Sequence, residues 1–276
     1  MRIGLGLPLA RPERLLGWAK RADDGPFRTL GLADRLLWDN PEPLVTLAAL
    51  AGATTRIRLQ TEVLLAPLRE PALLAKQAAT LDRLSGGRFT LGLGVGGRAD
   101  EFDLVGVDLR TRGHRFDEQL KTLRDIWSGG PIGPAPASEG GPEILIGAFA
   151  EPALERVARF ADGFLCAAPL SSAGRLLSFV EESWSRAGRA GRPRMVGQLS
   201  AALGPESTVE EARAQILSYY AFDPALAART AGLLLTTPAA IRDAVAEFTA
   251  LGADEVVLYC WSPDTDQVDR LADVFG

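Results

Sequence analysis

Three acidic residues follow predicted strands at positions where their side chains could transfer protons. Asp34 comes directly after the predicted strand 29–33. Glu62 lies near the end of the predicted strand 57–64, and Glu101 follows a glycine-rich loop. A carboxylate can serve as a general acid or base when its surroundings move its pKa toward the working pH. All three are candidate catalytic residues, with the alternative that Glu62 is an interior or rim carboxylate held by an arginine.

Two basic side chains are further candidates for a role in this chemistry. Arg35 is a candidate for charge pairing, because its guanidinium stays protonated near neutral pH. It could bind an anionic group of a cofactor or substrate, or it could hold Asp34. His114 is the only histidine, and an imidazole titrates near neutrality. It lies where a loop enters the predicted helix 113–127, without an evident base partner, so we interpret it as a partly exposed residue.

Two segments have a backbone that a ligand could approach closely. Gly94 and Gly96 lie in a loop with a single bulky side chain, and glycine lets the backbone come near a flat ring. Gly147, Ala148 and Phe149 join an apolar strand to a helix. Their N–H groups could bind an anion at the positive end of that helix. The alternative for this second segment is an ordinary strand-to-helix turn.

Aromatic and sulfur-containing side chains also occur near predicted strand ends. Trp38 and Trp261 are predicted at the rim, where an indole can stack on a planar ring or line a substrate pocket. Cys166 and Cys260 have no basic neighbour that would activate them, so we interpret both as small buried thiols. No histidine or cysteine accompanies the acids around Glu101, so we predict no metal site.

These residues need a scaffold that brings the ends of several strands together. In the stretch 73–97 an amphipathic helix ends at Ser85-Gly86-Gly87, and a strand follows at once. Eight strands alternate with helices along the chain, which predicts an α/β fold, a single (β/α)8 TIM barrel with right-handed parallel connections. The active site of such a barrel lies at the C-terminal ends of the strands. The predicted strands are 2–7, 29–33, 57–64, 88–93, 143–146, 163–166, 195–203 and 255–259.

Length, charge and motif searches narrow the class of protein. We predict one domain over 1–276, with the Pro/Gly-rich segment 129–142 as a loop within it. A net charge of −5 and dispersed arginines argue against a nucleic-acid partner. The sequence has no long apolar run and no signal-peptide pattern, so we expect no membrane association and a cytoplasmic protein. Motifs of Rossmann dehydrogenases, P-loop enzymes and α/β-hydrolases are missing in the contexts they require.

The longest specific signal in the chain is the run LAKQAATLDRLSGGRFTLGLGVGG at 74–97. Together with 57–69 and 112–118, it resembles the luciferase-like monooxygenase family. That resemblance implies a barrel enzyme that uses reduced FMN or the deazaflavin F420 on a small organic substrate. FMN would lead to oxygen insertion and F420 to hydride transfer. The resemblance also implies a homodimer and, as a further partner, a separate flavin reductase.

The resemblance implies roles for particular residues as well. Thr61, Glu62 and Val63 would form a bulge behind the ring, with a non-proline cis peptide between Glu62 and Val63. Gly94 and its neighbours would leave room for the ring. The turn that begins at Gly147 would hold the phosphate. This turn lacks the second glycine and the hydroxyl residue that the family often has there, so its grip would rest on the backbone alone.

One departure from the family pattern leaves the function open. Arg35 stands where the family often has a histidine, so Asp34, Glu62 or Glu101 would have to carry the proton. This departure supports an alternative function, a non-catalytic member that binds a ligand or a partner subunit. A weaker alternative, a phosphate-handling lyase or isomerase, rests on the fold alone.

Overall fold

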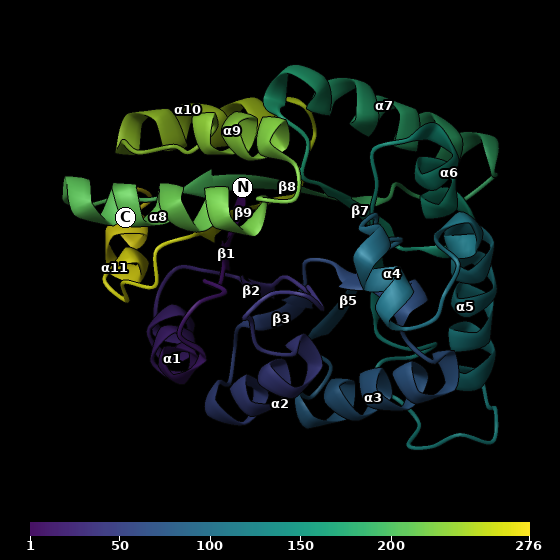
Figure 1. Cartoon of the computed structure of the whole chain (residues 1–276). Coiled ribbons are helices and arrows are strands. Elements are labelled where there is room, and N and C mark those ends of the chain that lie inside the picture. Colours follow the sequence, from purple (N-terminus) through teal and green to yellow (C-terminus); the bar gives the residue numbers. More distant parts are fainter.

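One parallel sheet closes on itself at the centre of the molecule (Figure 1). The computed structural model describes residues 1–276. The strands pair in the order β3-β2-β1-β9-β8-β7-β6-β5-β4, and pairing between β3 and β5 closes the ring. Because β3 and β4 are consecutive parts of one barrel strand, the barrel has the eight strands that were predicted. The strands are β1 (Arg2–Gly6), β2 (Thr29–Leu32), β3 (Arg58–Thr61), β4 (Leu64–Leu65), β5 (Phe89–Gly94), β6 (Glu143–Gly147), β7 (Gly163–Cys166), β8 (Arg194–Ala201) and β9 (Glu255–Cys260).

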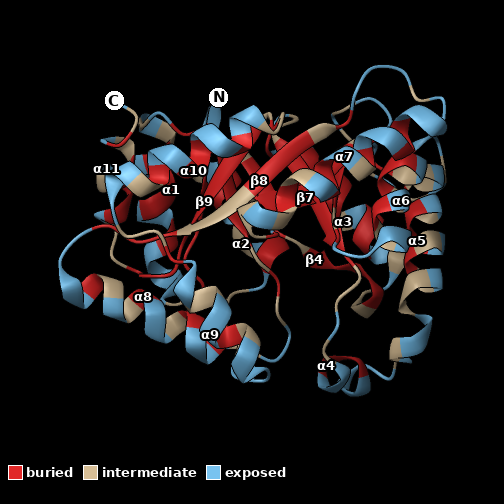
Figure 2. Ribbon diagram, turned by 90° about the horizontal axis from the view of Figure 1, so that it is seen from above, coloured by how far each residue is buried: buried red, intermediate tan, exposed pale blue.

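Helices surround the barrel and bury its outer surface (Figure 2). The sequence pattern did not predict the short helices α4 and α11, but it did predict the break at Pro224, where α9 begins. In Figure 2, α4, α8 and α9 lie along one edge of the molecule. The helices are α1 (Leu15–Asp24), α2 (Pro43–Ala53), α3 (Pro71–Leu84), α4 (Ala99–Leu104), α5 (Arg112–Trp127), α6 (Glu151–Phe160), α7 (Leu170–Arg186), α8 (Glu206–Tyr219), α9 (Pro224–Gly232), α10 (Pro238–Ala250) and α11 (Gln267–Ala272).

Local chemistry explains why several of these helices begin where they do. At the start of α3, the Glu70 side chain accepts a hydrogen bond from the Leu73 N–H at 2.9 Å, and Pro71 occupies the first helical position. A proline costs little there because the first N–H groups of a helix have no partner within the helix. Glu42 caps α2 in the same way, accepting from the Val45 N–H at 2.7 Å. These acid-proline pairs determine where each helix begins.

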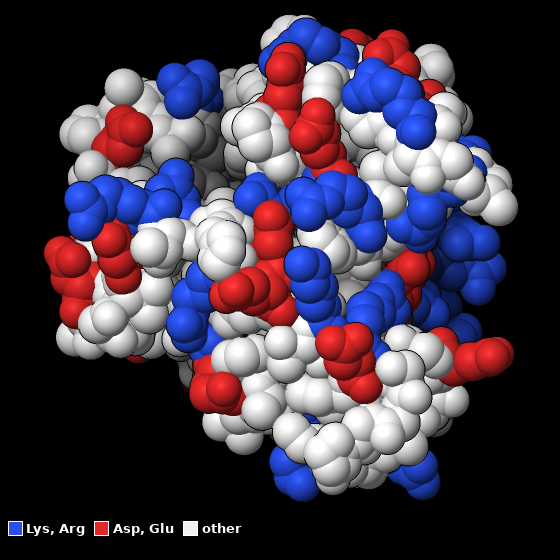
Figure 3. Space-filling model, turned by 90° about the vertical axis from the view of Figure 1, so that its right-hand side faces the viewer, with Lys and Arg blue, Asp and Glu red and all other residues white.

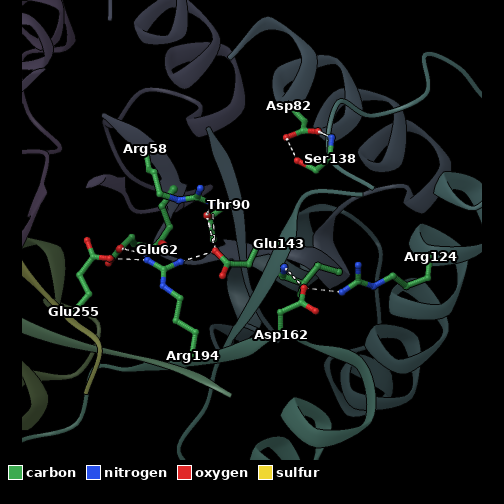
Figure 4. Close-up of polar contacts among 12 residues, drawn as sticks. Arg58, Glu62, Asp82, Thr90, Arg124, Ser138, Glu143, Asp162, Arg194 and Glu255 are labelled. Carbon is green, nitrogen blue, oxygen red and sulfur yellow. Dashed lines mark hydrogen bonds and ion pairs between the residues drawn. The ribbon is translucent and has the colours of Figure 1, made fainter. Parts of the chain in front are cut away.

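Ion pairs close the barrel at the N-terminal ends of the strands (Figure 4). Arg194 of β8 pairs with Glu143 of β6 and, at 2.6 Å, with Glu255 of β9. Arg58 of β3 donates to the Thr90 hydroxyl at 2.6 Å. An apolar layer lies next to these ion pairs, one step toward the C-terminal ends of the strands, and Val63 packs against it. In barrels of this kind the site lies at the opposite end, at the C-terminal ends of the strands. The layer consists of Leu145, Leu165, Val196 and Val257.

The outer surface carries charges of both signs. Figure 3 shows Lys and Arg side chains interspersed with Asp and Glu on the face that lies to the right in Figure 1. Arg156 of α6 pairs with Asp117 of α5 at 2.5 Å, and Arg124 of α5 pairs with Asp162, just before β7, at 2.8 Å. None of the helices has both the length and the apolar character needed to span a membrane.

Candidate functional site

The break between β3 and β4 is a bulge at the C-terminal end of the barrel. Its Glu62–Val63 peptide is cis, as the family resemblance implied. The Glu62 N–H donates to the carbonyl oxygen of Leu32 at 2.8 Å, and Thr61 Oγ1 donates to the carbonyl oxygen of Gly92 at 2.6 Å. The bulge is therefore tied to both neighbouring strands, β2 and β5.

The Val63 side chain occupies space that two glycines leave free. A Cβ atom at Gly94 would lie 2.5 Å from Val63 Cγ2, and one at Gly147 would lie 2.9 Å from Val63 Cγ1. The structure thus brings three predicted cofactor-binding residues together. Gly96 lies apart from them and faces Phe102, 3.2 Å from where its Cβ would be. It has a φ of 69°, a left-handed conformation that favours glycine.

Glu62 has its carboxyl group inside the barrel and is held by neutral partners. Gln60 Nε2 donates to Glu62 Oε1, and Gln198 Nε2 donates to Glu62 Oε2 at 3.1 Å. A Cβ at Gly31 would lie 2.6 Å from the carboxyl carbon, so this glycine makes room for the acid. Burial raises the pKa of Glu62 to about 8, although the hydrogen bond from Gln60 opposes the shift. The possibility that an arginine holds this carboxylate is therefore wrong.

Asp34 is held by Arg69, and Arg35 turns elsewhere. Asp34 Oδ2 accepts from Arg69 Nη2 at 2.9 Å and from the Leu65 N–H at 2.9 Å. The Arg35 guanidinium does not lock Asp34, one of the two roles that the sequence suggested for it. Asp34 instead ties the loop after β2 to the segment that follows the bulge, which is a structural role.

Arg35 and Glu101 form a partly buried ion pair. Arg35 Nη1 lies 3.1 Å from Glu101 Oε2, and the Glu101 side chain is fully buried. Glu101 Oε1 also accepts from the N–H groups of Leu36 at 2.9 Å and Leu37 at 3.2 Å. Burial by itself lowers the pKa of Arg35, but Tyr219 and Glu101 raise it by more, so the guanidinium stays charged. Every oxygen of Glu101 thus serves to position the loop after β2.

The two predicted rim tryptophans belong to one aromatic cluster. The Tyr219 ring lies between them, with its centroid 5.5 Å from that of Trp38 and 5.3 Å from that of Trp261. Trp261 Nε1 donates to Ser200 Oγ at 3.0 Å, which fixes the indole. Phe222 packs under the guanidinium of Arg98 with 4.7 Å between the Cζ atom and the ring centroid. Such a cluster can exclude water from a ring system bound beside it.

Sequence reasoning missed several residues of this region. Tyr219 comes from α8, in a stretch where the pattern gave only uncertain helical pieces, and nothing marked it as a neighbour of Arg35. Gln198 and Tyr259 come from strands across the barrel. Gln60 could have been found, because residues two apart in a strand point to the same side, and Gln60 precedes Glu62 by two.

The turn after β6 leads directly into α6. Ala148 is buried, whereas the Phe149 side chain is 63% exposed. Ala150 is the N-cap of α6 and makes no side-chain capping hydrogen bond. In the first turn of α6 only the Glu151 N–H is left for an anion, because Pro152 has no N–H and that of Ala153 donates to the carbonyl oxygen of Ala150 at 2.9 Å. That this turn holds a phosphate through its backbone stays a prediction.

His114 lies away from the bulge. Its side chain is 80% exposed, and its nearest acidic neighbour is Glu118 on the next turn of α5, at 3.6 Å. The structure places it on the surface, at the start of a helix, as interpreted from the sequence.

Both thiols are expected to be unreactive in the folded protein. Cys166 and Cys260 are buried, and burial raises the pKa of each above its ordinary value. Because the thiolate is the reactive form, a thiol reagent should modify neither residue near neutral pH. The same reagent should modify both after denaturation, counted by mass spectrometry. Modification of either thiol in the native protein would contradict the packing described here.

The model of the luciferase-like monooxygenase family matches residues 2–272. An uncharacterized protein of Mycobacterium tuberculosis is 38% identical over 136 residues, 45% of this chain and 47% of that protein. The matched part thus spans about half the length of this curated relative.

Two solved structures have the same fold as this chain. An F420-dependent secondary alcohol dehydrogenase, solved with an F420-acetone adduct, superposes with a TM-score of 0.82 at 18% identity, covering 99% of this chain and 98% of that one. The oxygenating constituent of 3,6-diketocamphane monooxygenase from Pseudomonas putida, in complex with FMN, gives a TM-score of 0.72 at 19% identity, covering 99% and 95%. The family model covers nearly the whole sequence, and the barrel agrees with it. The chain belongs to the luciferase-like monooxygenase family.

Proposed function

We propose that this protein is an oxidoreductase that binds FMN or F420 at the C-terminal end of its barrel and acts on a small organic substrate. One observation carries the proposal: Val63 at the bulge faces Gly94 and Gly147, the two glycines on the adjoining strands β5 and β6. Side chains are missing at both positions, so Val63 fits against β5 and β6, and the bulge forms a surface at the C-terminal end of the barrel against which a flat ring could lie. Membership of the family and the cofactors bound by the two solved structures support the same site.

The residues present fit a flavin-type group. The bulge at Thr61 to Val63 would lie behind the ring, and the backbone N–H groups of the turn that follows Gly147, up to that of Glu151, would hold the phosphate. The bound cofactor would supply either oxygen activation, for FMN, or hydride transfer, for F420. The protein would contribute orientation and a dry site, with Trp38 and Trp261 covering the substrate.

Arg35 has a positioning role in this proposal. Its guanidinium is engaged by Glu101 and by the Tyr219 hydroxyl, which accepts from Arg35 Nε at 3.3 Å. A cation with these partners holds the loop after β2 in place, and it leaves proton transfer to another group. The rival function, a non-catalytic relative, draws on the same replacement of the family histidine.

The proposal also includes a homodimer, a flavin reductase as a partner, and a location in the cytoplasm. Val45 of α2 and Leu73 of α3 are apolar side chains that are 70% and 55% exposed, which supports contact between two copies of the chain. Reduced FMN would come from a separate flavin reductase, and the protein would act in the cytoplasm.

An anaerobic binding titration tests the function. FMN and F420 are each added in oxidised and reduced form, and binding is followed by cofactor absorbance and tryptophan quenching. We expect one reduced cofactor to bind with a Kd on the order of micromolar, near −8 kcal/mol. Binding of FMN would direct the substrate screen to oxygen insertion, and binding of F420 to hydride transfer.

A matched pair of glycine variants locates the binding site. Gly94→Val adds a side chain against Val63, so it should weaken binding at least tenfold. Gly52→Ala, on the outer helix α2, meets no atom within 4 Å and should bind as the parent does. No binding of any of the four ligand forms by the parent protein would refute the enzyme proposal and favour the non-catalytic relative.

A further inference from the structure

We infer that Glu62 is the proton-binding group of the barrel mouth, and that the site accepts its cofactor when the Glu62 carboxyl is neutral. The inference rests on the proposed function, because the cofactor is the ligand that would cover the bulge. It assigns to Glu62 the proton chemistry for which Asp34 and Glu101 were equal candidates in the sequence. The three carboxyls differ in the groups that bind them: two are paired with arginines, and Glu62 is not.

Asp34 and Glu101 are both paired with a cation. Asp34 accepts from the Arg69 guanidinium at 2.9 Å, and Glu101 accepts from that of Arg35 at 3.1 Å. Each also accepts backbone N–H hydrogen bonds, of which the one from Leu65 to Asp34 measures 2.9 Å. A proton added to either carboxylate would break a charge-assisted hydrogen bond. Both carboxylates are thus already engaged as ion-pair partners of arginines.

Glu62 is held by amides alone, and these partners can stay in place when the carboxyl changes its charge. Gln60 and Gln198 donate to its two oxygens. The Gln60 Oε1 atom is buried and has no hydrogen-bond partner. An amide rotated by half a turn would present this oxygen to a protonated Glu62, and the carboxyl O–H could then donate to it. A neutral Glu62 carboxyl would thus supply the hydrogen-bond donor that the buried Gln60 Oε1 atom lacks.

The charged groups that face Glu62 do not neutralise it. Glu255 and Arg194 lie toward the closed end of the barrel, and they are paired with each other at 2.6 Å. Tyr259, across the barrel, accepts from the Ala33 N–H at 2.7 Å and carries a hydroxyl whose pKa is raised by its burial. The pKa of Glu62 is raised to about 8, by burial first, with Glu255 adding to the shift and Arg194 opposing it.

A ligand on the bulge would stabilise the neutral form further. Glu62 is 8% exposed, so a ring placed against the bulge would remove its remaining contact with water. Loss of water disfavours the ionised carboxyl. A ligand that binds the neutral form better must therefore take up a proton when it binds at a pH above the pKa of the free protein. The proton would then lie on the Glu62 carboxyl, beside the ring.

The test compares the wild-type protein with Glu62→Gln, in which an uncharged amide replaces the acid. The Kd of the cofactor found by the binding titration is measured from about pH 6 to about pH 9.5. The cofactor's own ionisations affect both proteins equally, so the ratio of the two affinities reports Glu62 alone. We expect wild-type affinity relative to the variant to be constant below about pH 7 and to fall toward tenfold per pH unit above about pH 8.5.

Two further measurements guard the result. Calorimetry in two buffers of different ionisation enthalpy should show more proton uptake on binding by the wild type than by Glu62→Gln at about pH 8.5.

The control variant Asp103→Asn changes an exposed acid of α4, and its affinity and proton uptake should equal those of the wild type at every pH. If Glu62→Gln does not fold, the infrared band of the protonated carboxyl is titrated in the wild type, with and without cofactor. Its midpoint should move to higher pH when the cofactor is bound.

Each outcome separates this inference from the proposed function. An affinity ratio that does not change with pH, or a carboxyl band whose midpoint ignores the cofactor, overturns the role of Glu62 and leaves the cofactor site standing. Failure of both proteins to bind any cofactor at every pH overturns the proposed function, and the Glu62 inference with it.

Discussion

Replacing Glu101 by alanine is expected to lower the free energy of unfolding by about 3 to 5 kcal/mol. The side chain is fully buried and serves three donors, which are the Arg35 guanidinium and the N–H groups of Leu36 and Leu37. Removal of the carboxylate leaves a cation that is only 13% exposed without its partner. Two backbone donors lose their acceptor at the same time, which adds to the cost.

Chemical denaturation of Glu101→Ala, Arg35→Ala and the double variant measures this effect. If the ion pair is the cause, the double variant should lose less stability than the two single variants added together, because neither charge is left alone. Hydrogen exchange at Leu36 and Leu37 should speed up in Glu101→Ala. Asp100→Ala is the matched control, since Asp100 is an exposed acid on the same helix and should change stability little.

The Glu101→Ala substitution should also affect the cofactor site. The loop that Glu101 holds carries Trp38, which packs on Tyr219. Glu101→Ala is therefore expected to weaken cofactor binding even at temperatures where the protein stays folded. A loss below about 1 kcal/mol in Glu101→Ala, or strict additivity in the double variant, would contradict the account of this ion pair.

The barrel could be predicted from the sequence because its signals are local. Each strand and helix has its own periodicity, and boundaries are marked by residue pairs such as Glu70-Pro71 at a helix start and Gly86-Gly87 at a helix end. Such signals depend on neighbours in the chain, so the alternation of strands and helices fixes the topology. The small helices α4 and α11 were not predicted, because six residues are too few to show a helical periodicity.

The polar contacts of the site could not be predicted, because they join distant segments. Arg35 reaches Glu101, 66 residues away, and Tyr219, 184 residues away. Periodicity carries no information on which of several arginines meets which acid, so the sequence left Arg69 unmentioned as the partner of Asp34. The location of the site was accessible because strand ends meet at one edge of any such barrel.

Glu62 shows what the sequence can predict and what only the folded structure can show. The sequence placed Glu62 near the end of a strand, and the resemblance placed it in a bulge, but the two readings of its side chain were equally supported. Only the neighbours across the barrel decide between them. Gln198 and the space at Gly31 show a carboxyl that is held inside by neutral groups.

Gly92→Ala is expected to cost about 3 kcal/mol of stability or more, because the barrel has no room for a side chain there. A Cβ atom at Gly92 would lie 2.0 Å from the carbonyl oxygen of Thr61 and 2.9 Å from Leu165 Cδ1. The first neighbour is backbone, which cannot turn aside as a side chain can. The strands β3 and β5 would have to separate at the point where Thr61 Oγ1 donates to the Gly92 carbonyl. Denaturation monitored by circular dichroism measures the loss.

Gly52→Ala provides the control, because Gly52 lies in α2 with no atom within 4 Å of a Cβ. Alanine favours a helix over glycine by about 0.5 to 1 kcal/mol, so this variant should gain stability by the same method. A stable, cofactor-binding Gly92→Ala protein would mean that β5 can move away from the bulge without harm. Since Gly92 and Gly94 belong to one strand, a shift of β5 that accommodates the new methyl group also displaces the backbone that faces Val63. Gly92→Ala should therefore lose cofactor affinity together with stability, whereas Gly94→Val should lose affinity with a smaller loss of stability, because the atoms nearest to its Cβ belong to the side chain of Val63 and not to the backbone.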